Sequence, residues 1–490
     1  MRCPTIKASR RRPRGRPTGR AASSARSWIS AWVAAVVLPA VVGSGAPAYA
    51  APDGITATAV SFRGDGGVTL HGTVLAPAAT GQQRPGLVMI EGAGNRGAQE
   101  LRPAAEAYAR QGIVTLIYDK RTVGYSFLHR DYSVLADDAL AGLHLLRSRA
   151  DVDPARSGLW GLSEGAWVAP LAANRSPDVK FLITVGAVGL TPSVQTAWAY
   201  GEFLRQAGVS GSLRHTMQVT ATRVVVGAGL FPEAGFDPVP TWEHLRQPVL
   251  AQWGEYDRQA VPVQSSQIIQ QTLRRGGNTH YTIRFVPGVQ HDLNLTTNGG
   301  FDHLSSIRAD YGTFEAAWIN NIDKNPPPST IGSPPHQDQT SHPVAPLAWY
   351  ESPWLQLAAL LLLLAGFAGY PLIAAGRRIL GHREPQPTRL PARLLAATGL
   401  TTVAGFLLYM FFMLATAANL IGPVLLGRPL PWLILQTLAL ATVAATITTA
   451  TAWRRHHHTL DRTNRVRLGL LLTAGLTFLP WALYCGLLIP

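Results

Sequence analysis

The chain has 490 residues, enough for two or three domains, and a net charge of +15. The charge is uneven, because residues 1–50 carry +9 and residues 351–490 carry +8, which leaves −2 for the region between them. This middle region lacks the basic surface of a nucleic-acid-binding protein, and two cysteines, Cys3 and Cys485, exclude a disulfide framework within the chain and a cysteine-based zinc site.

Residues 1–50 have the pattern of an export signal. An arginine-rich stretch precedes the apolar run WISAWVAAVVLPAVVG, and the following APAYA offers small residues at Ala48 and Ala50 for cleavage before Ala51. An uncleaved anchor helix is the alternative, although the apolar run is short for a bilayer span. We therefore expect the signal peptide to export the chain from residue 51 onward.

Residues 55–322 alternate between short β-rich runs and longer helical segments. The β-rich runs are GVTLHGTVLA, GLVMIEG, GIVTLIYD, FLITVG, PVLAQWG and YTIRFVP, and segment 134–149 repeats leucine and alanine at roughly helical spacing. Strands that alternate with helices predict an α/β domain whose mostly parallel sheet is covered on both faces. Residues 56–74, around the GDGG turn, predict an antiparallel hairpin at the sheet edge.

A serine between two glycines occurs where one of these strands meets a helix. In SGLWGLSEGAWVAPLAA, Ser163 stands between Gly161 and Gly165. This strand–turn–helix context is typical of a nucleophile elbow, whose sharp turn exposes the serine hydroxyl at the carboxyl end of the strand. We expect two backbone N–H groups to bind the developing oxyanion, those of Glu164 and of Ala93 in the glycine-rich loop EGAGNRG.

A serine nucleophile needs a histidine base and a carboxylate that orients the histidine. In this architecture the acid and then the histidine follow the serine in the chain, both at strand ends. Asp257 follows the strand PVLAQWG, and His291 follows YTIRFVP just beyond a Pro-Gly turn. We predict a Ser163–His291–Asp257 triad, with Glu255 left open as the acid. Residues of the same types that fit less well are Asp292, His280 and His303.

Residues 188–246 interrupt the alternation. Between two core strands, this segment is rich in aromatic and aliphatic residues and contains no clear strand. An α/β core does not need such an insertion, and we predict that it forms a helical cap over the site.

These motifs resemble those of the α/β-hydrolase superfamily, and most of all those of bacterial esterases and acyl-peptidase-like serine hydrolases with DKRGxGxS and GxSEGG signatures. The chain reads DKRTVGYS from Asp119 and GLSEGA around Ser163. The resemblance implies an α/β-hydrolase fold over residues 51–322 and cleavage of carboxylic esters or thioesters, with neither metal nor organic cofactor. A peptidase, an acyl-peptidase or an acyltransferase using the same triad is the alternative, and a non-catalytic membrane-linked binding module is a further one.

Three positions depart from the signatures. Glu91 replaces the usual histidine of the oxyanion loop, Thr122 replaces a glycine in the DKRG turn, and Ala166 replaces the second glycine after the elbow. The first two bear on the shape of the pocket, and none touches the triad. Asp119 and Arg121 are expected to brace the structure, as an ion pair or a loop support.

A linker and a membrane region follow the α/β domain. Residues 323–347 are rich in proline, serine and polar residues and predict a semi-rigid linker. Residues 348–490 contain four apolar segments, each long enough to span a bilayer: about 352–376, 394–421, 430–452 and 468–489. None has an acid or base in its middle, which argues against an ion or proton pathway. The HHH run at 456–458 lies among arginines, and we interpret it as a solvated basic face.

Arginines fall on alternate loops of the membrane region. Five follow the first span and five follow the third, whereas the loop between the second and third spans carries only Arg428. The positive-inside rule places the first and third loops in the cytoplasm and the linker outside, the orientation that the export signal also predicts. We expect a multi-pass cell-membrane protein whose extracytoplasmic α/β domain acts on a small-molecule or peptidyl acyl substrate, with membrane lipid around its spans and no nucleic-acid partner.

Overall fold

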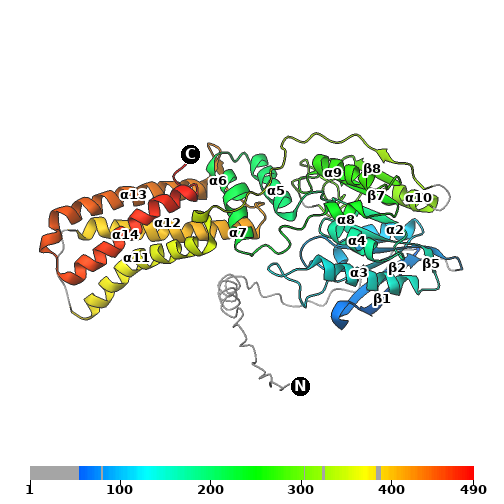
Figure 1. The fold of residues 1–490 in the computed structure, drawn as a ribbon, viewed down its shortest axis with the longest axis horizontal. Coiled ribbons are helices and arrows are strands. Elements are labelled where there is room, and N and C mark those ends of the chain that lie inside the picture. The colour runs from blue at the N-terminus through cyan, green and yellow to red at the C-terminus, as the bar shows by residue number, and fades with distance from the viewer. Residues whose placement is uncertain (1–53, 79–80, 303, 323–325, 382–387) are drawn as a thin grey trace, which may run out of the picture. The chain divides into compact units, whose positions relative to one another are not determined.

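The computed structural model describes residues 54–78, 81–302, 304–322, 326–381 and 388–490 (Figure 1). The predicted signal peptide, residues 1–50, lies outside the described residues, as does His303. By its internal contacts the chain from Ala51 to Pro490 forms one unit. Within it, an α/β domain with an inserted group of helices precedes four long apolar helices.

Among the described residues, nine strands form a sheet at the centre of the α/β domain, in the order β1-β2-β4-β3-β5-β6-β7-β8-β9. Strand β2 is antiparallel to β1 and β4, and the later neighbours pair in parallel. This is the strand order of an α/β-hydrolase fold, and the predicted hairpin is the β1–β2 pair at its edge. The strands are β1 Ile55–Arg63, β2 Thr69–Pro77, β3 Arg84–Ile90, β4 Val114–Tyr118, β5 Val152–Leu162, β6 Leu182–Val185, β7 Val249–Gly254, β8 Tyr281–Val286 and β9 Thr330–Ile331.

Helices cover both faces of the sheet, and each face has its own hydrophobic core. Leu87 and Val88 are neighbours on β3 but belong to different cores, because successive side chains of a strand point to opposite faces. One core includes α3 Tyr132–Arg147, α4 Gly165–Arg175, α8 Val239–Glu243 and α9 Pro262–Arg275, and the other includes α2 Arg102–Arg110 and α10 Thr313–Asn321. The carboxyl ends of the parallel strands are therefore held by packing from both sides.

The insertion between β6 and β7 is helical. Before α8, which packs in a core of the sheet, its helices are α5 Pro192–Gln206, α6 Ser212–His215, a π-helical segment Thr216–Ala221 and α7 Thr222–Gly227. The segments from α6 to α7 follow one another without a break, so that the π-helical segment is a widened stretch inside a longer helix. We refer to residues 192–227 as the cap helices.

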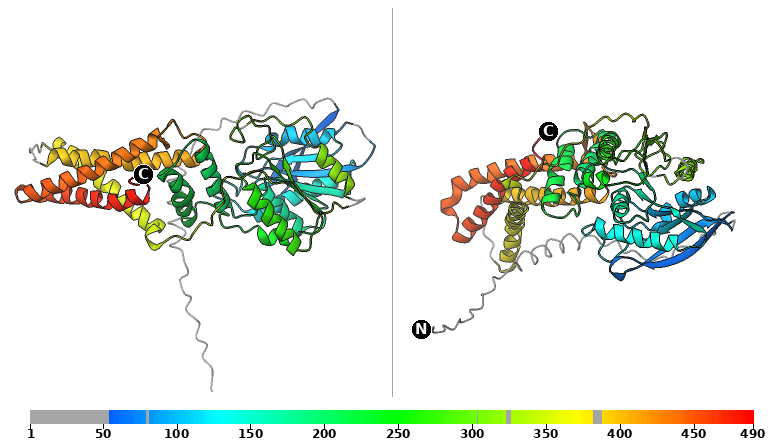
Figure 2. Two further views of the ribbon diagram at one scale, coloured as in Figure 1. Left: turned by 90° about the horizontal axis from the view of Figure 1, so that it is seen from above. Right: turned by 45° about the vertical axis from the view of Figure 1, so that its right-hand side comes forward.

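Four long helices form the described part of the C-terminal region, and each is long and apolar enough to cross a membrane. They are α11 Pro353–Ile379, α12 Arg389–Ala415, α13 Leu430–His456 and α14 Arg462–Tyr484. Helices α12, α13 and α14 run side by side (Figures 1 and 2). Small residues let the backbones approach closely, because a Cβ at Gly366 would lie 2.4 Å from the Cβ of Ala474.

The structure differs from several of the predicted boundaries. The fourth span was predicted at 468–489, but α14 begins at Arg462 and ends at Tyr484. The second predicted span continued to residue 421, but α12 ends at Ala415, because Ala417 and Ala418 turn the chain with φ of 49° and 60°. The predicted linker contributes the edge strand β9, and beyond it Gln339 accepts a hydrogen bond from the Trp198 indole at 3.0 Å. The described part of this segment is therefore attached to the α/β domain and to the cap helices.

Candidate active site

Ser163 lies in the sharp turn between β5 and α4. Its backbone has a φ of 54°, in the left-handed region that a non-glycine residue adopts only when its surroundings hold it there. The flanking glycines are required by close packing: a Cβ at Gly161 would lie 2.1 Å from the carbonyl oxygen of Gly165, and a Cβ at Gly165 would lie 2.4 Å from that of Ile90. The Ser163 N–H donates to the carbonyl oxygen of Val185 on β6 at 2.9 Å. These are the features of a nucleophile elbow.

His291 and Asp257 meet beyond the carboxyl ends of β8 and β7. The Nδ1 of His291 lies 2.9 Å from Oδ2 of Asp257, and both side chains are buried. The other carboxylate oxygen of Asp257 accepts the backbone N–H groups of Gln259 and Ala260 at 2.8 and 2.9 Å. The acid is therefore fixed from two sides, and one of its oxygens is directed at the imidazole.

The second imidazole nitrogen is not hydrogen-bonded to Ser163 or to any other described residue. His291 Nε2 is buried and has no hydrogen-bond partner in the described part of the chain. The ring packs against Gly186, where an added Cβ would lie 2.5 Å from Cε1. Gly186 directly follows Val185, which accepts the Ser163 N–H, so the serine and the histidine approach the same two residues of β6 and its loop.

The charge state of His291 reflects opposing influences. Burial disfavours the imidazolium, but the charge of Asp257 and its hydrogen bond to the ring outweigh burial and raise the pKa of His291 above 6.5. A histidine whose protonated form is stabilised in this way is suited to accept a proton during a reaction and to return it.

The other residues that the sequence left open lie elsewhere. The carboxylate of Glu255 accepts the N–H of Gly288 at 2.9 Å. Asp292 accepts the backbone and side-chain N–H groups of Asn294. His280 precedes β8, with its Nδ1 3.4 Å from the carbonyl oxygen of Pro327, at the opposite end of the strand from His291. In this geometry Asp257 is the carboxylate that orients the histidine.

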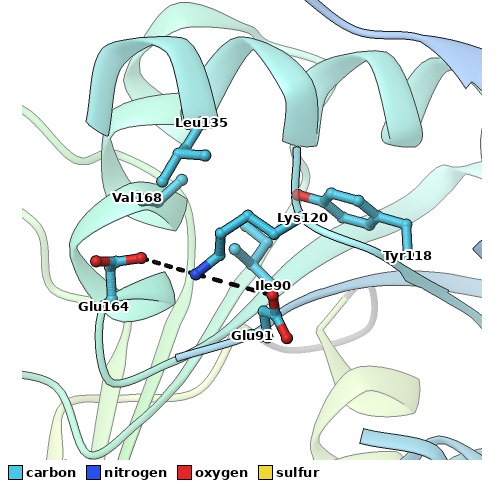
Figure 3. A pocket seen from close by; sticks show the side chains of 7 residues that line it. All are labelled: Ile90, Glu91, Tyr118, Lys120, Leu135, Glu164 and Val168. Atoms are coloured by element: carbon cyan, nitrogen blue, oxygen red, sulfur yellow. Dashed lines mark hydrogen bonds and ion pairs between the residues drawn. The ribbon is translucent and has the colours of Figure 1, made fainter. Parts of the chain in front are cut away.

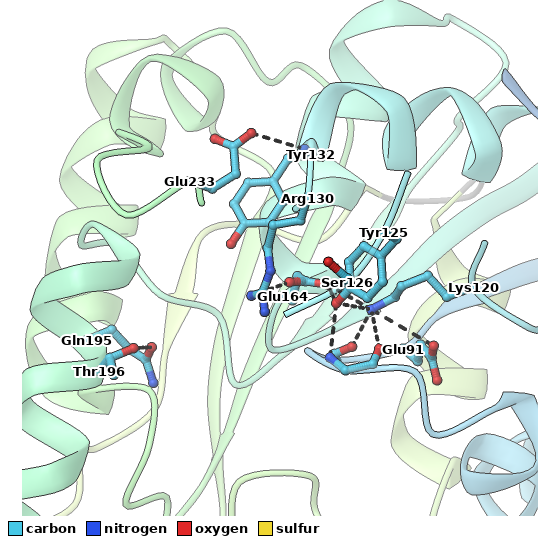
Figure 4. Close-up of polar contacts among 12 residues, drawn as sticks. Glu91, Lys120, Tyr125, Ser126, Arg130, Tyr132, Glu164, Gln195, Thr196 and Glu233 are labelled. Carbon is cyan, nitrogen blue, oxygen red and sulfur yellow. Dashed lines mark hydrogen bonds and ion pairs between the residues drawn. The ribbon is translucent and has the colours of Figure 1, made fainter. Parts of the chain in front are cut away.

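A buried group of charged and phenolic side chains surrounds Glu164 (Figure 4). One oxygen of its carboxylate accepts hydrogen bonds from Lys120 Nζ and from the Tyr125 hydroxyl, each at 2.7 Å, and the other accepts one from Arg130 at 2.9 Å. Glu164 is only 1 % exposed, so that water screens these ion pairs weakly. The sequence assigned Glu164 a backbone role alone and missed this side-chain role.

The same group holds the loop of residues 91–97, which we call the oxyanion loop. Lys120 Nζ donates to the carbonyl oxygens of Gly92 at 2.5 Å and Gly94 at 3.1 Å, on either side of Ala93. The N–H of Gly94 donates to the Tyr125 hydroxyl at 3.0 Å. Lys120 and Tyr125 therefore fix the oxyanion loop to the first turn of α4. The same contacts hold the backbone around both expected oxyanion donors, the N–H groups of Ala93 and Glu164.

Two further residues of the DKRTVGYS motif, Asp119 and Arg121, brace the structure. Asp119 accepts the N–H of Ala98 at 2.8 Å, at the end of the oxyanion loop. Arg121 forms a buried ion pair with Asp138 at 2.6 Å and donates to the carbonyl oxygen of Asp65. The sequence indicated these bracing roles for Asp119 and Arg121, but it did not indicate the roles of Lys120 and Tyr125 in the same motif.

Glu91 lies at the end of β3, beside Lys120 (Figure 3). Its side chain is buried, and its Oε1 lies 3.9 Å from Lys120 Nζ without a hydrogen-bond partner in the described part of the chain. Burial, only partly offset by Lys120, raises the pKa of Glu91 to about 7. A cavity of about 10 Å³, close to the size of one water molecule, adjoins both side chains. Among the described residues, no cluster of three or more His, Cys, Asp or Glu could hold a metal ion.

Comparison with known proteins finds hydrolases and acyl-transfer enzymes. No family model matches the chain. It is 31 % identical over 130 residues to a thiohydrolase of Arthrinium phaeospermum, which is 26 % of this chain and 41 % of that protein. It is 34 % identical over 108 residues to an acyltransferase of Aspergillus calidoustus, which is 21 % of this chain and 35 % of that protein. The chain thus spans less than half the length of these curated relatives.

The solved structures that the comparison finds are more distant in sequence. DcsB in complex with its substrate analogue is 19 % identical, with a TM-score of 0.38 and coverage of 55 % of this chain and 99 % of that one. Acylaminoacyl peptidase of Pyrococcus horikoshii is 14 % identical, with a TM-score of 0.39 and coverage of 58 % and 43 %.

Proposed function

We propose that this α/β-hydrolase domain is a membrane-tethered serine hydrolase that cleaves carboxylic ester or thioester bonds. The observation that carries the proposal is the buried His291–Asp257 pair, whose imidazole packs against Gly186, the residue after the Val185 carbonyl that accepts the Ser163 N–H. A histidine oriented by a carboxylate, next to a serine in a strained elbow, is the arrangement that activates a serine hydroxyl.

The reaction then proceeds through an acyl-enzyme. Ser163 Oγ attacks the acyl carbonyl carbon while its proton passes to His291 Nε2, and Asp257 stabilises the imidazolium. When the tetrahedral intermediate collapses, the bond to the leaving group breaks and the imidazolium gives its proton to that group. Water, deprotonated by His291, attacks the acyl-enzyme and releases the acid, which restores the serine hydroxyl.

Two backbone N–H groups are proposed to stabilise the oxyanion of both tetrahedral intermediates. They belong to Ala93 and Glu164, and in the described part of the chain neither has a hydrogen-bond acceptor. Donors that are fixed before the charge develops cost no reorganisation in the transition state. Because Lys120 and Tyr125 hold the surrounding backbone, we propose that they keep these donors in place.

Transfer of the acyl group to an alcohol or thiol, in place of water, is a second candidate function that uses the same residues. The similarity to an acyltransferase as well as to a thiohydrolase favours it over the peptidase and acyl-peptidase alternatives. We further propose that residues 348–490 lie in the cell membrane with the α/β domain on the extracytoplasmic side, as four apolar helices and the distribution of arginines support.

Labelling of the full chain with a fluorophosphonate probe tests this proposal, together with turnover of a panel of esters, thioesters and aminoacyl anilides. Ser163→Ala should abolish labelling and lower kcat by roughly a millionfold, because the nucleophile is lost. The panel distinguishes an esterase from a peptidase, and added alcohol or thiol acceptors reveal acyl transfer. A Ser163→Ala protein with more than a few per cent of the wild-type rate would overturn the assignment, and a wild-type chain that neither labels nor turns over any substrate would indicate the non-catalytic module.

A further inference from the structure

The cap helices form a common hydrophobic core with the membrane region. Apolar side chains from α5 through the π-helical segment are buried in one cluster with residues of α11 to α14. The residues of the long helices include Trp432 of α13 and Trp481 of α14. The contributing residues of the cap are Phe203, Leu204, Val209, Leu213 and Met217. Because these side chains are buried against the long helices, the cap helices are fixed to the bundle and do not form a free lid.

Buried hydrogen bonds fix the direction of this packing. The hydroxyl of Ser212 accepts bonds from the Trp432 indole at 3.2 Å and from the Gln436 side chain at 3.3 Å. The hydroxyl of Thr216 donates to the carbonyl oxygen of Cys485 at 3.2 Å. Loss of the Ser212 hydroxyl would leave two buried donors without this acceptor, which is costly in an apolar surrounding. The contact between cap helices and bundle is therefore specific as well as apolar.

The other side of α5 contacts the loop that carries the triad acid. We call residues 255–261 the acid loop. Gln195 Nε2 donates to the carbonyl oxygen of Gln259 at 2.6 Å, and the Thr196 hydroxyl holds the Gln195 amide at 3.2 Å (Figure 4). Two turns further along α5, buried Glu202 lies 3.9 Å from the Arg258 guanidinium. Helix α5 thus contacts the acid loop at two successive residues.

These contacts reach the imidazole in three steps. The Gln195 side chain donates to the carbonyl oxygen of Gln259. The N–H of Gln259 donates to the Asp257 carboxylate at 2.8 Å. The other oxygen of Asp257 lies 2.9 Å from Nδ1 of His291. The acid loop ends at Val261, whose φ of 50° is unfavourable for a β-branched residue. Such a conformation persists only where the surrounding contacts impose it, so the position of Asp257 depends on what holds the loop.

We propose that the four membrane helices support the catalytic triad, by fixing the cap helices so that α5 holds the acid loop through Gln195. Gln195 is then a positioning residue, and the bundle does more than tether the domain. This inference rests on the proposed function, because it concerns the acid of the proposed triad.

Kinetics of the full chain in lipid nanodiscs test the inference with two variants. Gln195→Leu removes the donor to Gln259 at similar size, and the double variant Ser212→Ala/Thr216→Val removes the polar contacts with the bundle. Each should lower kcat by roughly tenfold, the effect of about one hydrogen bond, with KM changed less than twofold. Because Asp257 raises the pKa of His291, a looser acid should also move the acidic limb of the kcat–pH profile to lower pH.

Thr437→Val is the matched control, since this hydroxyl bonds only to Leu433 within α13 and faces outward. It should leave kcat and the pH profile unchanged, and unchanged thermal unfolding of Gln195→Leu would separate positioning from misfolding. Wild-type kcat and pH profile in both test variants would overturn the inference and leave the serine hydrolase proposal standing. Activity that survives Ser163→Ala would instead remove the premise.

Discussion

At the scale of single residues, two carboxylates that are two positions apart in the sequence have different surroundings. Asp257 contacts the imidazole of His291, whereas Glu255 accepts the N–H of Gly288 in a turn. Asp257→Asn should lower kcat by roughly ten-thousandfold, because the amide favours the wrong imidazole tautomer. Glu255→Gln should change kcat by less than about tenfold. Steady-state kinetics of both variants check the assignment, and the reverse order of effects would identify Glu255 as the acid.

The sequence led to the proposed triad because each of its residues stands at a strand end in a fixed chain order. It did not lead to the side-chain role of Glu164, because the partners of that carboxylate come from other parts of the chain. Lys120 is 44 residues away in sequence and Tyr125 is 39. The lysine and the tyrosine of the DKRTVGYS motif were the available signal. Their contacts with Glu164 depend on how the loops after β3 and β4 pack, and the local sequence pattern does not indicate this packing.

At the scale of elements, the carboxyl group of Glu91 lies at the junction of β3 with the oxyanion loop and has a raised pKa. Burial raises the pKa of Glu91 from 4.5 to about 7, so the folded protein keeps a proton that the unfolded chain releases above pH 4.5. This contribution to stability is complete below pH 4.5 and is lost as the pH rises through 7. Glu91→Gln should therefore gain stability relative to wild type between pH 5 and pH 8, by up to about 3 kcal/mol. Thermal unfolding of both proteins across this range measures the gain, and a difference that does not vary with pH would contradict it.

The core strands could be predicted from short β-rich runs, and the inserted helices from an apolar segment that contains no clear strand. Strand β9 could not, since two residues in a proline-rich stretch become a strand only by pairing with β8. The end of α12 was also predicted wrongly, because the apolar residues of the turn after Ala415 continue the hydropathy of the helix. Hydropathy indicates that a segment lies in apolar surroundings, not that it is helical. A loop that packs against the ends of apolar helices lies in the same apolar surroundings.

At the scale of the whole molecule, the arginine-rich loops predict the orientation of the chain. Loops 377–393 and 453–467 together carry ten arginines, against one in the loop between the second and third spans, so both should face the cytoplasm. A phosphatase reporter that is active only outside the cytoplasm should be active when fused after residue 345 and inactive when fused at 460. Reporter assays in intact cells measure this. An active fusion at 460 would place the α/β domain inside the cell or show that a span is misassigned.

The bonding of the cap helices to the bundle also has a consequence for biosynthesis. Trp432 lies 220 residues beyond its partner Ser212, and a ribosome that adds about 5–20 residues per second needs roughly 10–45 s to make that length of chain. For that interval Leu204, Leu213 and Met217, which are fully buried in the finished protein, lack the packing surface that α13 and α14 contribute to their cluster. Exposed apolar side chains favour aggregation, so we expect the cap helices to need shielding until the last two long helices have been made. A nascent chain that stops before α13 contains the whole proposed triad and still lacks the surface that completes its cap.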